Sequence, residues 1–231
     1  MLALAFPAAA FGTNCYVLAV GEGQECVVID PGIGVTDTLA QVLREHRLRP
    51  SAVLLTHGHI DHTYSVTPVC GGELAAYIHT DDRYRLTDPL ASLGPQLLAV
   101  FEQQFGSAAT WSEPSDVVSV KDRARLELAG LSLEVLHAPG HTEGSVMFGV
   151  DAVPDGVSDE AACARTMLTG DVLFAGSIGR TDLEGGSDRA MQNSLRNVVL
   201  PLPDDTLVLP GHGPGSTMAR ERATNPHLQN L

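Results

Sequence analysis

Basic side chains are scarce in this sequence. Its 231 residues include 14 Lys and Arg against 28 Asp and Glu, so the formal net charge is −14 at pH 7. Nucleic-acid binding depends on clustered basic side chains that neutralise phosphates, and docking on an anionic membrane surface has the same requirement. We therefore expect neither a nucleic acid nor a membrane as the partner of this chain.

Cysteine is also scarce, and its spacing carries no motif. The four cysteines form no CxxC pair and no zinc-finger spacing; they are Cys15, Cys26, Cys70 and Cys163. In a chain of this size the simplest interpretation is that they are reduced and serve in packing. Any metal site must then be built from histidine and carboxylate side chains.

Long apolar runs are absent. No run reaches the roughly 18–20 residues that span a bilayer. The longest apolar stretch, Leu2–Phe11, is interrupted by Pro7, and no basic segment precedes it as in a signal peptide. It leads directly into a predicted strand, so we expect a cytoplasmic protein.

Apolar residues are plentiful, at 44% of the chain, which is enough for a sizeable core without disulfides. Short runs rich in Val, Ile and Leu alternate with segments of helical periodicity, which favours an α/β layered architecture. No repeat or linker is visible, so we predict one domain spanning residues 1–231. The predicted strands are Cys15–Val20, Glu25–Ile29, Ala52–Thr56, Ala75–His79, Val117–Val120, Arg125–Leu128, Leu131–Ala138, Ser145–Val150, Thr166–Thr169 and Leu207–Leu209, and the predicted helices are Thr36–Arg47, one that begins near His62, and one across Ser187–Leu200.

Two segments interrupt this rhythm. Asp82–Pro114 has polar flanks rich in Pro and Gly around a helical apolar spacing at Pro89–Phe105, and we interpret it as an excursion over one edge of the fold. Its role stays open, because a helix that lines a substrate pocket and a helix that covers the core have the same pattern. Asp151–Arg165 is predicted to be a surface insert.

Nine histidines are present, and the densest cluster directly follows a predicted strand. The string Thr56-His57-Gly58-His59-Ile60-Asp61-His62 contains four potential ligands, which packing does not explain, because ionisable side chains are costly to bury unpaired. His57 and His59 flank one glycine and can clamp a cation from a single loop. Asp61 and His62 lie further round the turn, where they can serve a second cation.

Three more potential ligands follow glycines at strand ends: His141 after Gly140, Asp171 after Gly170, and His212 after Gly211. The carboxyl ends of strands are the usual place for a site in layered α/β folds. Together with the first string they make five histidines and two aspartates, enough for two cations that share one bridging carboxylate. This donor set suits zinc, and also iron or manganese.

These motifs resemble the metallo-β-lactamase-fold hydrolases, and in particular their glyoxalase II-like (hydroxyacylglutathione hydrolase-like) branch. The resemblance covers nearly the whole chain. Besides the ligand string it rests on Asn14–Val17, Asp30–Gly32, Pro139–Thr142, Gly170-Asp171, Gly179–Asp182, Pro210–Gly213 and Glu221–Pro226. The fold that it implies is a four-layer αββα sandwich, with two mixed sheets flanked by helices and the site on one edge.

The resemblance also implies a role for each ligand. The expected ligands of the first metal are His57, His59 and His141, those of the second are Asp61, His62 and His212, and the bridge is Asp171. Asp30 would support the ligand loops from behind, although a turn-forming aspartate before a proline has the same pattern. His137, four residues before His141, is a candidate for the same kind of supporting role.

The expected chemistry is hydrolysis. Two divalent ions, most simply Zn²⁺, share a water and lower its pKa from 15.7 toward about 7, which yields a hydroxide at neutral pH. One ion polarises the substrate carbonyl, the metal-bound hydroxide attacks it, and Asp61 orients that hydroxide. The implied substrate is a small-molecule acyl-thiol of the S-lactoylglutathione type, which would make the chain a thioesterase.

Individual residues favour this branch of the family. The commonest β-lactamases carry Arg at the position of His62 and lack a bridge like Asp171, and the tRNA-processing nucleases need a basic surface. Two alternatives stay open. One is a mononuclear iron persulfide dioxygenase, which shares the Gly-Arg-Thr-Asp stretch at 179–182. The other is an acyl-lactone lactonase with an apolar acyl pocket.

One feature of full-length glyoxalase II is missing from the pattern. That enzyme has a C-terminal helical extension that supplies basic residues to the glutathione moiety, whereas this sequence stops soon after His212. Arg180 is the candidate for binding a substrate carboxylate, although a solvated surface arginine has the same pattern. The acyl group, the thiol, the metal in vivo and the oligomeric state are not determined by the sequence.

Overall fold

The computed structural model describes residues 1–231 except 91–97, 100, 102, 104–110, 158–162 and 230. Most strands belong to two six-stranded sheets. The first sheet has the order β1 (Leu2–Pro7), β2 (Asn14–Ala19), β3 (Glu25–Ile29), β4 (Arg49–Leu54), β5 (Ala75–His79) and β6 (Val117–Val120). The second has the order β14 (Ser216–Thr217), β13 (Thr206–Pro210), β10 (Arg165–Gly170), β9 (Val146–Val150), β8 (Leu131–His137) and β7 (Arg125–Leu128). Two short strands, β11 (Leu173–Phe174) and β12 (Ser177–Ile178), pair with each other.

Both sheets are mixed. In the first, β1, β2 and β3 pair antiparallel, and β3 to β6 pair parallel. In the second, β10 and β13 are parallel and the other neighbours are antiparallel. Strands β8, β10 and β13 consequently run in the same direction, and their carboxyl ends lie at the same edge of the second sheet.

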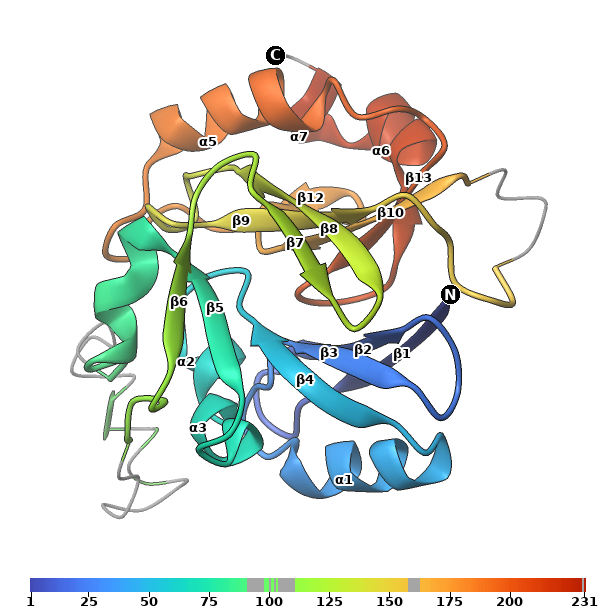
Figure 1. Ribbon diagram of the computed structural model, residues 1–231. Coiled ribbons are helices and arrows are strands. Elements are labelled where there is room, and N and C mark those ends of the chain that lie inside the picture. Colours follow the sequence, from blue (N-terminus) through green and yellow to red (C-terminus); the bar gives the residue numbers. More distant parts are fainter. Residues whose placement is uncertain (91–97, 100, 102, 104–110, 158–162, 230) are drawn as a thin grey trace.

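Helices lie outside the two sheets. In Figure 1, α1 and α3 lie below the first sheet, and α5, α6 and α7 lie above the second. The predicted four-layer αββα sandwich is therefore confirmed. The helices are α1 (Thr36–Glu45), α2 (Ile60–Thr63), α3 (Val66–Cys70), the 3₁₀ helix η1 (Thr80–Leu86), α5 (Asp188–Ser194), the π-helical η3 (Leu195–Val199), α6 (Met218–Thr224) and α7 (Pro226–Gln229).

The layered core explains why several strands read as continuous apolar runs. Successive side chains of a strand point to opposite faces, and in β2 both faces are covered. Cys15 and Val17 pack in the cluster on the helix side of the first sheet, whereas Tyr16 and Leu18 pack in the cluster between the sheets. A third cluster fills the space between the second sheet and its helices.

Three of the differences between the structure and the sequence prediction have a clear physical reason. Strand β1 was not predicted, because its apolar residues show no clean alternation; it forms by antiparallel pairing along β2. Strand β4 begins at Arg49 and not at Ala52, because Arg49 and Pro50 pair with β3. The helix predicted across Ser187–Leu200 is α5 followed by a π-helical turn.

The segment predicted to be an excursion over one edge begins inside the protein. Asp82, Arg85 and Leu86 in η1 are buried, so that interpretation is wrong for the first residues of Asp82–Pro114. Most of the predicted helix at Pro89–Phe105 lies outside the described residues, although residues 98, 99, 101 and 103 are helical. Part of the predicted insert at Asp151–Arg165 also lies outside them. Within the described part of the chain, no helix has the length and apolar character needed to cross a membrane.

Candidate metal centre

The segments that follow β4, β8, β10 and β13 converge at one edge of the sandwich. Each of these strands is largely buried and leads into a loop or, for β4, into the short helix α2. These segments bring together all seven side chains that the sequence predicts as ligands: His57, His59, Asp61, His62, His141, Asp171 and His212.

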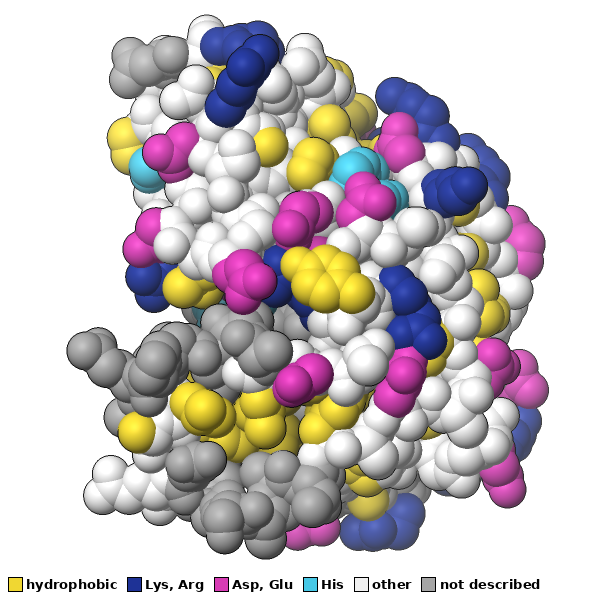
Figure 2. Space-filling view, turned by 90° about the vertical axis from the view of Figure 1, so that its left-hand side faces the viewer, with side chains coloured by type: hydrophobic (Ala, Val, Ile, Leu, Met, Phe, Trp, Pro, Cys, Tyr) yellow, Lys and Arg dark blue, Asp and Glu magenta, His cyan; other side chains and the backbone are white. Residues whose placement is uncertain are grey.

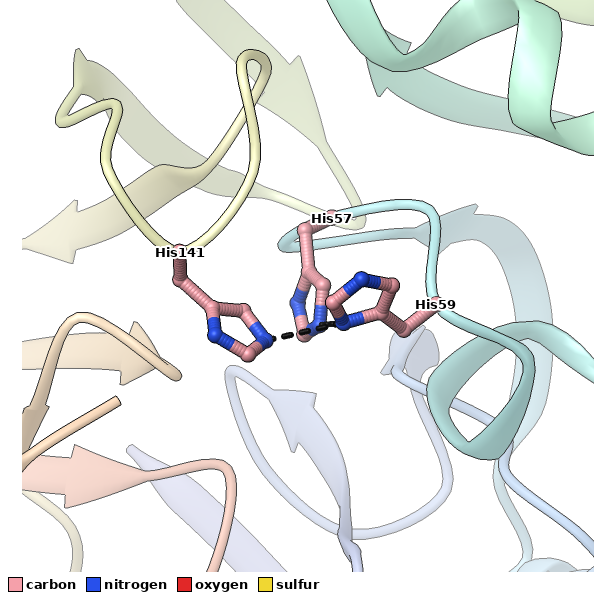
Figure 3. A group of neighbouring side chains, drawn as sticks. All are labelled: His57, His59 and His141. Atoms are coloured by element: carbon pink, nitrogen blue, oxygen red, sulfur yellow. Dashed lines mark hydrogen bonds between the residues drawn. The ribbon is translucent and has the colours of Figure 1, made fainter. Parts of the chain in front are cut away.

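Three buried histidines form the first group. Figure 3 shows His57 and His59 on one loop facing His141 on another. The Nδ1 atom of His59 lies 3.2 Å from His57 Nε2 and 2.9 Å from His141 Nε2. Three imidazole nitrogens, carried by loops that follow strands of the two different sheets, therefore lie within reach of a single ion.

Asp61, His62 and His212 form the second group, which is less buried. The Nε2 atom of His212 lies 3.3 Å from His62 Nε2 and 3.3 Å from Asp61 Oδ2. His62 is fully buried, but the side chain of His212 is 28% exposed and that of Asp61 is 21% exposed. This group therefore faces the solvent side of the site.

Asp171 lies between the two groups. Its Oδ1 atom is 3.4 Å from His62 Nε2, and its Oδ2 atom is 3.5 Å from both His141 Nε2 and His212 Nε2. One carboxylate thus contacts members of both groups. Among the described residues its buried Oδ1 atom has no hydrogen-bond partner, which is costly for an ionised group unless a cation takes that position.

Gly211 allows Asp171 to take this position. A Cβ atom at residue 211 would lie 2.2 Å from Asp171 Oδ1 and 2.8 Å from His62 Cε1. The amide of Gly211 also donates a hydrogen bond to the carbonyl of Gly170, which fixes the two ligand loops against each other. Glycine before His212 is therefore a steric requirement of the site.

The three-histidine group is held in the neutral form. Burial lowers the pKa of His57 well below its ordinary value, and neighbouring histidines lower it further. Burial and His141 lower the pKa of His59 to about 3. Burial also lowers the pKa of His141, although Asp171 opposes this shift. Neutral imidazole is the form that binds metal ions, so these nitrogens are available at neutral pH.

The second group carries charge. Burial opposes the ionisation of Asp61 and Asp171, but the imidazoles of His62 and His212 outweigh it and lower the pKa of both carboxyls. The same carboxylates raise the pKa of His62 and His212 against the effect of burial. In the absence of a cation, protons on these imidazoles balance the carboxylates, and a divalent ion would replace them.

The donor set fits divalent metal ions. Five imidazoles and two carboxylates lie within ligand distance in overlapping groups. A bound cation would also give a partner to Asp171 Oδ1, which has no hydrogen bond to any described residue. Nitrogen and carboxylate donors in this ratio suit zinc, iron or manganese.

Asp30 lies directly behind His62, as the sequence predicted. Its Oδ2 atom lies 2.9 Å from His62 Nδ1 and accepts a hydrogen bond from the Thr56 hydroxyl, while Oδ1 accepts from the Thr56 amide. A carboxylate on the far nitrogen of a histidine fixes the orientation of the ring and leaves Nε2 free to bind a metal. Asp30 also has a left-handed backbone with φ +50°, which a plain turn residue before Pro31 does not need.

Sequence reasoning missed the residues that hold the His212 loop. The amide of Asn14 donates to the Gly211 carbonyl, and both the Asn14 side chain and the Tyr16 hydroxyl donate to the Pro210 carbonyl. The hydroxyl of Thr13 donates to Asp61 Oδ2 at 3.0 Å. The stretch Asn14–Val17 was recognised only as part of a resemblance; its role follows from these contacts.

Arg180 contributes to the site through its backbone. Its carbonyl accepts a 2.7 Å hydrogen bond from His141 Nδ1, which orients that ring as Asp30 orients His62. Its guanidinium forms a paired contact with Asp182 at 2.7 and 2.8 Å and is largely exposed. The side chain lines the cavity described below, so the predicted contact with a substrate carboxylate requires it to leave Asp182.

His137 lies apart from the seven predicted ligands. It stacks on His79 with the ring centroids 3.9 Å apart, and its Nε2 atom donates to the Glu143 carbonyl. Among the described residues it contacts none of the seven, so no direct contact supports the role that was predicted for it. With Asp81 it forms a further His-Asp-His trio, but two nearly parallel rings do not direct their in-plane lone pairs at one ion.

A cavity of about 240 Å³ opens onto both ligand groups. One wall is apolar and is made by Phe11, Ile60, Phe101 and Leu183. The remaining lining residues are Arg180 and five of the predicted ligands, His59, Asp61, His141, Asp171 and His212. In the Pro89–Phe105 segment, whose role the sequence leaves open between a pocket wall and a core cover, Phe101 lines the cavity, and residues 91–97 lie outside the described residues.

A second cavity of about 530 Å³ lies beside the first. Its lining includes Ile178, Arg180, Gln192, Arg196 and His227. Arg180 lines both cavities, so the two spaces meet at this side chain. The second cavity is more polar in its lining residues and offers two guanidinium groups.

Comparison with known proteins agrees with this geometry. Residues 8–212 match the family model of the metallo-beta-lactamase superfamily. The hydroxyacylglutathione hydrolase GloC of Haemophilus influenzae is 32% identical over 224 residues, which cover 97% of this chain and 96% of the relative.

Two solved structures are similar over nearly their whole length. The B3 metallo-beta-lactamase BLEG-1 is 34% identical with a TM-score of 0.80, and the match covers 99% of this chain and 100% of that one. TTHA1623 in a di-iron-bound form is 33% identical with a TM-score of 0.72, over 96% of this chain and 98% of that one.

Proposed function

Because the chain belongs to the metallo-beta-lactamase superfamily, we propose that it is a binuclear metallohydrolase, and specifically a glyoxalase II-like thioesterase. The observation that carries this proposal is the position of Asp171, whose two carboxylate oxygens contact histidines of both ligand groups while Oδ1 has no hydrogen-bond partner in the described part of the chain. A carboxylate in this position is suited to bridging two cations.

Each ligand group would hold one divalent ion, with zinc as the first choice and iron or manganese as the other candidates. His57, His59 and His141 would bind the first; Asp61, His62 and His212 would bind the second, with Asp171 common to both. Two such ions supply Lewis acidity toward a carbonyl and acidify a shared water. The di-iron-bound form of TTHA1623 supports a pair of ions, and it makes iron a serious candidate.

Asp61 is the residue that would orient the attacking water. The imidazoles of His62 and His212 keep its pKa low, so the carboxylate stays ionised and accepts hydrogen bonds at neutral pH. The Thr13 hydroxyl fixes Oδ2, and Asp61 lines the cavity where a substrate would lie. A positioned, ionised carboxylate can therefore accept a hydrogen bond from the water and hold it in place for attack.

In the proposed binding mode, the acyl group and the thiol portion of the substrate lie in different cavities. The cavity of about 240 Å³ with the apolar wall suits a small acyl group next to the ligand groups. The larger cavity beyond Arg180 suits the thiol portion. In this arrangement Arg180 exchanges its partner Asp182 for a carboxylate of the leaving thiol, such as a glutathione carboxylate.

The surroundings agree with a small-molecule substrate. On the face shown in Figure 2, the described Lys and Arg side chains lie scattered among Asp and Glu and form no continuous patch. The net charge of −14 also disfavours a nucleic-acid partner. None of the four cysteines forms a disulfide, and three of them are buried, which suits the cytoplasm that we propose as the location.

The test combines metal analysis with a substrate panel. We expect two divalent ions per chain, thioester hydrolysis that a chelator abolishes and added metal restores, and the highest kcat/KM on S-lactoylglutathione. A long-chain lactone, a β-lactam and a glutathione persulfide serve as comparators. The β-lactam is included because BLEG-1, at 34% identity, is a B3 metallo-beta-lactamase.

The comparators decide between reaction classes. One iron per chain together with oxygen uptake on the persulfide would overturn the proposal in favour of a dioxygenase. Faster turnover of the lactone or of the β-lactam than of any thioester would overturn it in favour of that hydrolase. Full activity after exhaustive chelation would remove the metal centre from the mechanism altogether.

Arg180 provides a sharper test of the leaving group. Arg180→Gln should raise the KM for acyl-glutathione thioesters by about tenfold, since a charge-assisted hydrogen bond is worth roughly 1.5–3 kcal/mol. It should leave the KM for thioesters of the neutral thiol N-acetylcysteamine unchanged. Arg189→Gln is the matched control, because Arg189 is exposed and lines neither cavity. Equal effects on both thioesters would contradict this role for Arg180.

A further inference from the structure

Asp82 is a fully buried carboxylate that lies outside the seven ligands. It belongs to η1, and its two oxygens accept four hydrogen bonds. Oδ2 accepts from the Gly58 amide at 2.8 Å and from the Thr142 hydroxyl at 2.7 Å. Oδ1 accepts from the Gly144 amide at 2.8 Å and from Arg85 Nε at 3.3 Å.

The donors belong to the two loops that carry the first ligand group. Gly58 lies between His57 and His59 on the loop after β4 of the first sheet. Thr142 directly follows His141 on the loop after β8 of the second sheet. No sheet hydrogen bond joins these two strands, since β4 and β8 belong to different sheets. The carboxylate of Asp82 is thus a direct link between the two halves of the three-histidine group.

The glycines in these loops make the link sterically possible. A Cβ atom at residue 58 would lie 2.7 Å from the Arg85 side chain, and one at residue 144 would lie 2.5 Å from the Asp82 amide. Arg85 in turn donates to the Glu143 carboxylate at 2.7 Å and to the Glu184 carbonyl at 2.9 Å. The helix η1 therefore packs tightly against both loops, and Asp82 lies at their junction.

We propose that Asp82 is a positioning residue that joins the His57–His59 loop to the His141 loop and so sets the metal affinity of the three-histidine group. The proposal rests on the metal centre proposed above and adds a residue that acts on one ion only. Asp30 supports the other ion, because its carboxylate contacts His62 Nδ1, and through the Thr56 hydroxyl, which lies 3.1 Å from His57 Nδ1, it also reaches the three-histidine group.

A carboxylate is required at this position, and an amide of the same shape is not equivalent. Each oxygen of Asp82 accepts from a backbone N–H, of Gly58 on one side and of Gly144 on the other. Asn presents one acceptor oxygen and one NH₂ donor, so in either orientation it faces one backbone N–H with a donor. Asp82→Asn must therefore release one of the two loops while it preserves the volume of the side chain.

The experiment measures zinc affinity separately at the two ligand groups by competition with a chromophoric chelator. A His212→Ala background keeps the three-histidine group intact, and a His141→Ala background keeps the second group intact. In the first background Asp82→Asn should weaken zinc binding by about 10–100-fold, the usual effect of losing such a supporting contact. In the second background the change should stay within about threefold. Asp30→Asn should weaken zinc binding in both backgrounds, because Asp30 contacts His62 directly and reaches His57 through the Thr56 hydroxyl.

Asp81→Asn is the matched control. Asp81 is the preceding residue of the same helix, its side chain is 53% exposed, and it bonds to neither histidine loop. The same substitution there should leave both zinc affinities unchanged. Equal losses in both backgrounds for Asp82→Asn, or no loss in the first, would overturn the positioning role.

A second pair of variants covers the case in which Asp82→Asn does not fold. Thr142→Val removes one of the four hydrogen bonds to Asp82, and Thr142→Ser keeps it. The Val variant should bind zinc several-fold more weakly than the Ser variant in the His212→Ala background, and equal affinities would overturn the proposal. If the three-histidine group binds no zinc even with Asp82 intact, the binuclear function itself fails, which is a different outcome from loss of the positioning role.

Discussion

The three-histidine group and the Asp61–His62–His212 group lie side by side, but they differ in burial and in charge. The first consists of buried imidazoles whose pKa values are lowered, so it is a neutral donor set. The second contains a carboxylate and two imidazoles whose pKa values are raised, and its Asp61 and His212 side chains are partly exposed. A neutral, buried group would suit a permanently bound ion, whereas a charged, partly exposed group would suit an ion that exchanges ligands with water.

Asp171→Ala tests what the two groups share, and we expect the largest effect from it. The change removes the carboxylate that contacts both groups, so hydrolysis should fall about 10³-fold, equivalent to several kcal/mol of lost transition-state stabilisation. Bound metal should fall with it. The measurement is kcat/KM together with metal content per chain, and full turnover in this variant would show that Asp171 is not the bridge.

Gly211→Ala tests whether the spacing of the groups matters when every donor is kept. The new methyl would lie 2.2 Å from Asp171 Oδ1 and would displace that carboxylate from the second group. A displacement of about 1 Å at a reacting centre costs roughly 100-fold in rate. Gly21→Ala, at a position with no atom within 4 Å of the added methyl, is the control. Unchanged turnover in Gly211→Ala would mean that the site tolerates a shift of its bridge.

The pH dependence of metal binding separates the groups by their charge. His62 and His212 have raised pKa values, so they retain protons that an ion must displace, and the apparent affinity falls by about tenfold per pH unit for each displaced proton. The histidines of the first group have lowered pKa values and stay unprotonated. As pH falls from about 7.5 to about 5, the second ion should therefore leave first. Equilibrium dialysis across this range checks the order, which simultaneous release would contradict.

Phe11→Ala tests the open side of the second group, and its effect should be the smallest. Phe11 is 56% exposed, has a left-handed backbone with φ +61° and lines the apolar wall of the cavity. Loss of partial apolar burial should raise the KM by about 3–10-fold with kcat nearly unchanged. Val20→Ala, at another exposed apolar side chain that does not line the cavity, should have no effect. A change in kcat alone would contradict a purely binding role for Phe11.

Much of the fold followed from the sequence because most of its strands are short runs rich in apolar residues, bounded by polar or turn-forming residues. Strands β3, β5, β6 and β7 have the predicted bounds. Strand β1 could not be predicted, since it is defined by pairing along β2 rather than by its own pattern. The first residues of the 82–114 segment were misjudged for a similar reason: Asp82 and Arg85 look like surface residues until the loops that they contact are in place.

The candidate site shows the same difference between residues with a local sequence pattern and residues that are defined only by tertiary contacts. The histidines and aspartates after glycines at strand ends carried enough pattern to name all seven side chains that the structure gathers. Apart from Asp30, the residues that orient them carried none. The Arg180 carbonyl and the Asp82 carboxylate act on partners 39 and 60 residues away in the chain, at His141 and Thr142 respectively.

The sequence by itself determined which donors are available and that they end their strands, because those facts depend on residue type and local spacing. Only the tertiary structure decided that Asp171 touches both groups, that one group is buried and neutral while the other is partly exposed and charged, and that buried carboxylates support both. Burial and electrostatic coupling depend on distances between segments far apart in the chain, and those distances exist only once the two sheets have packed together.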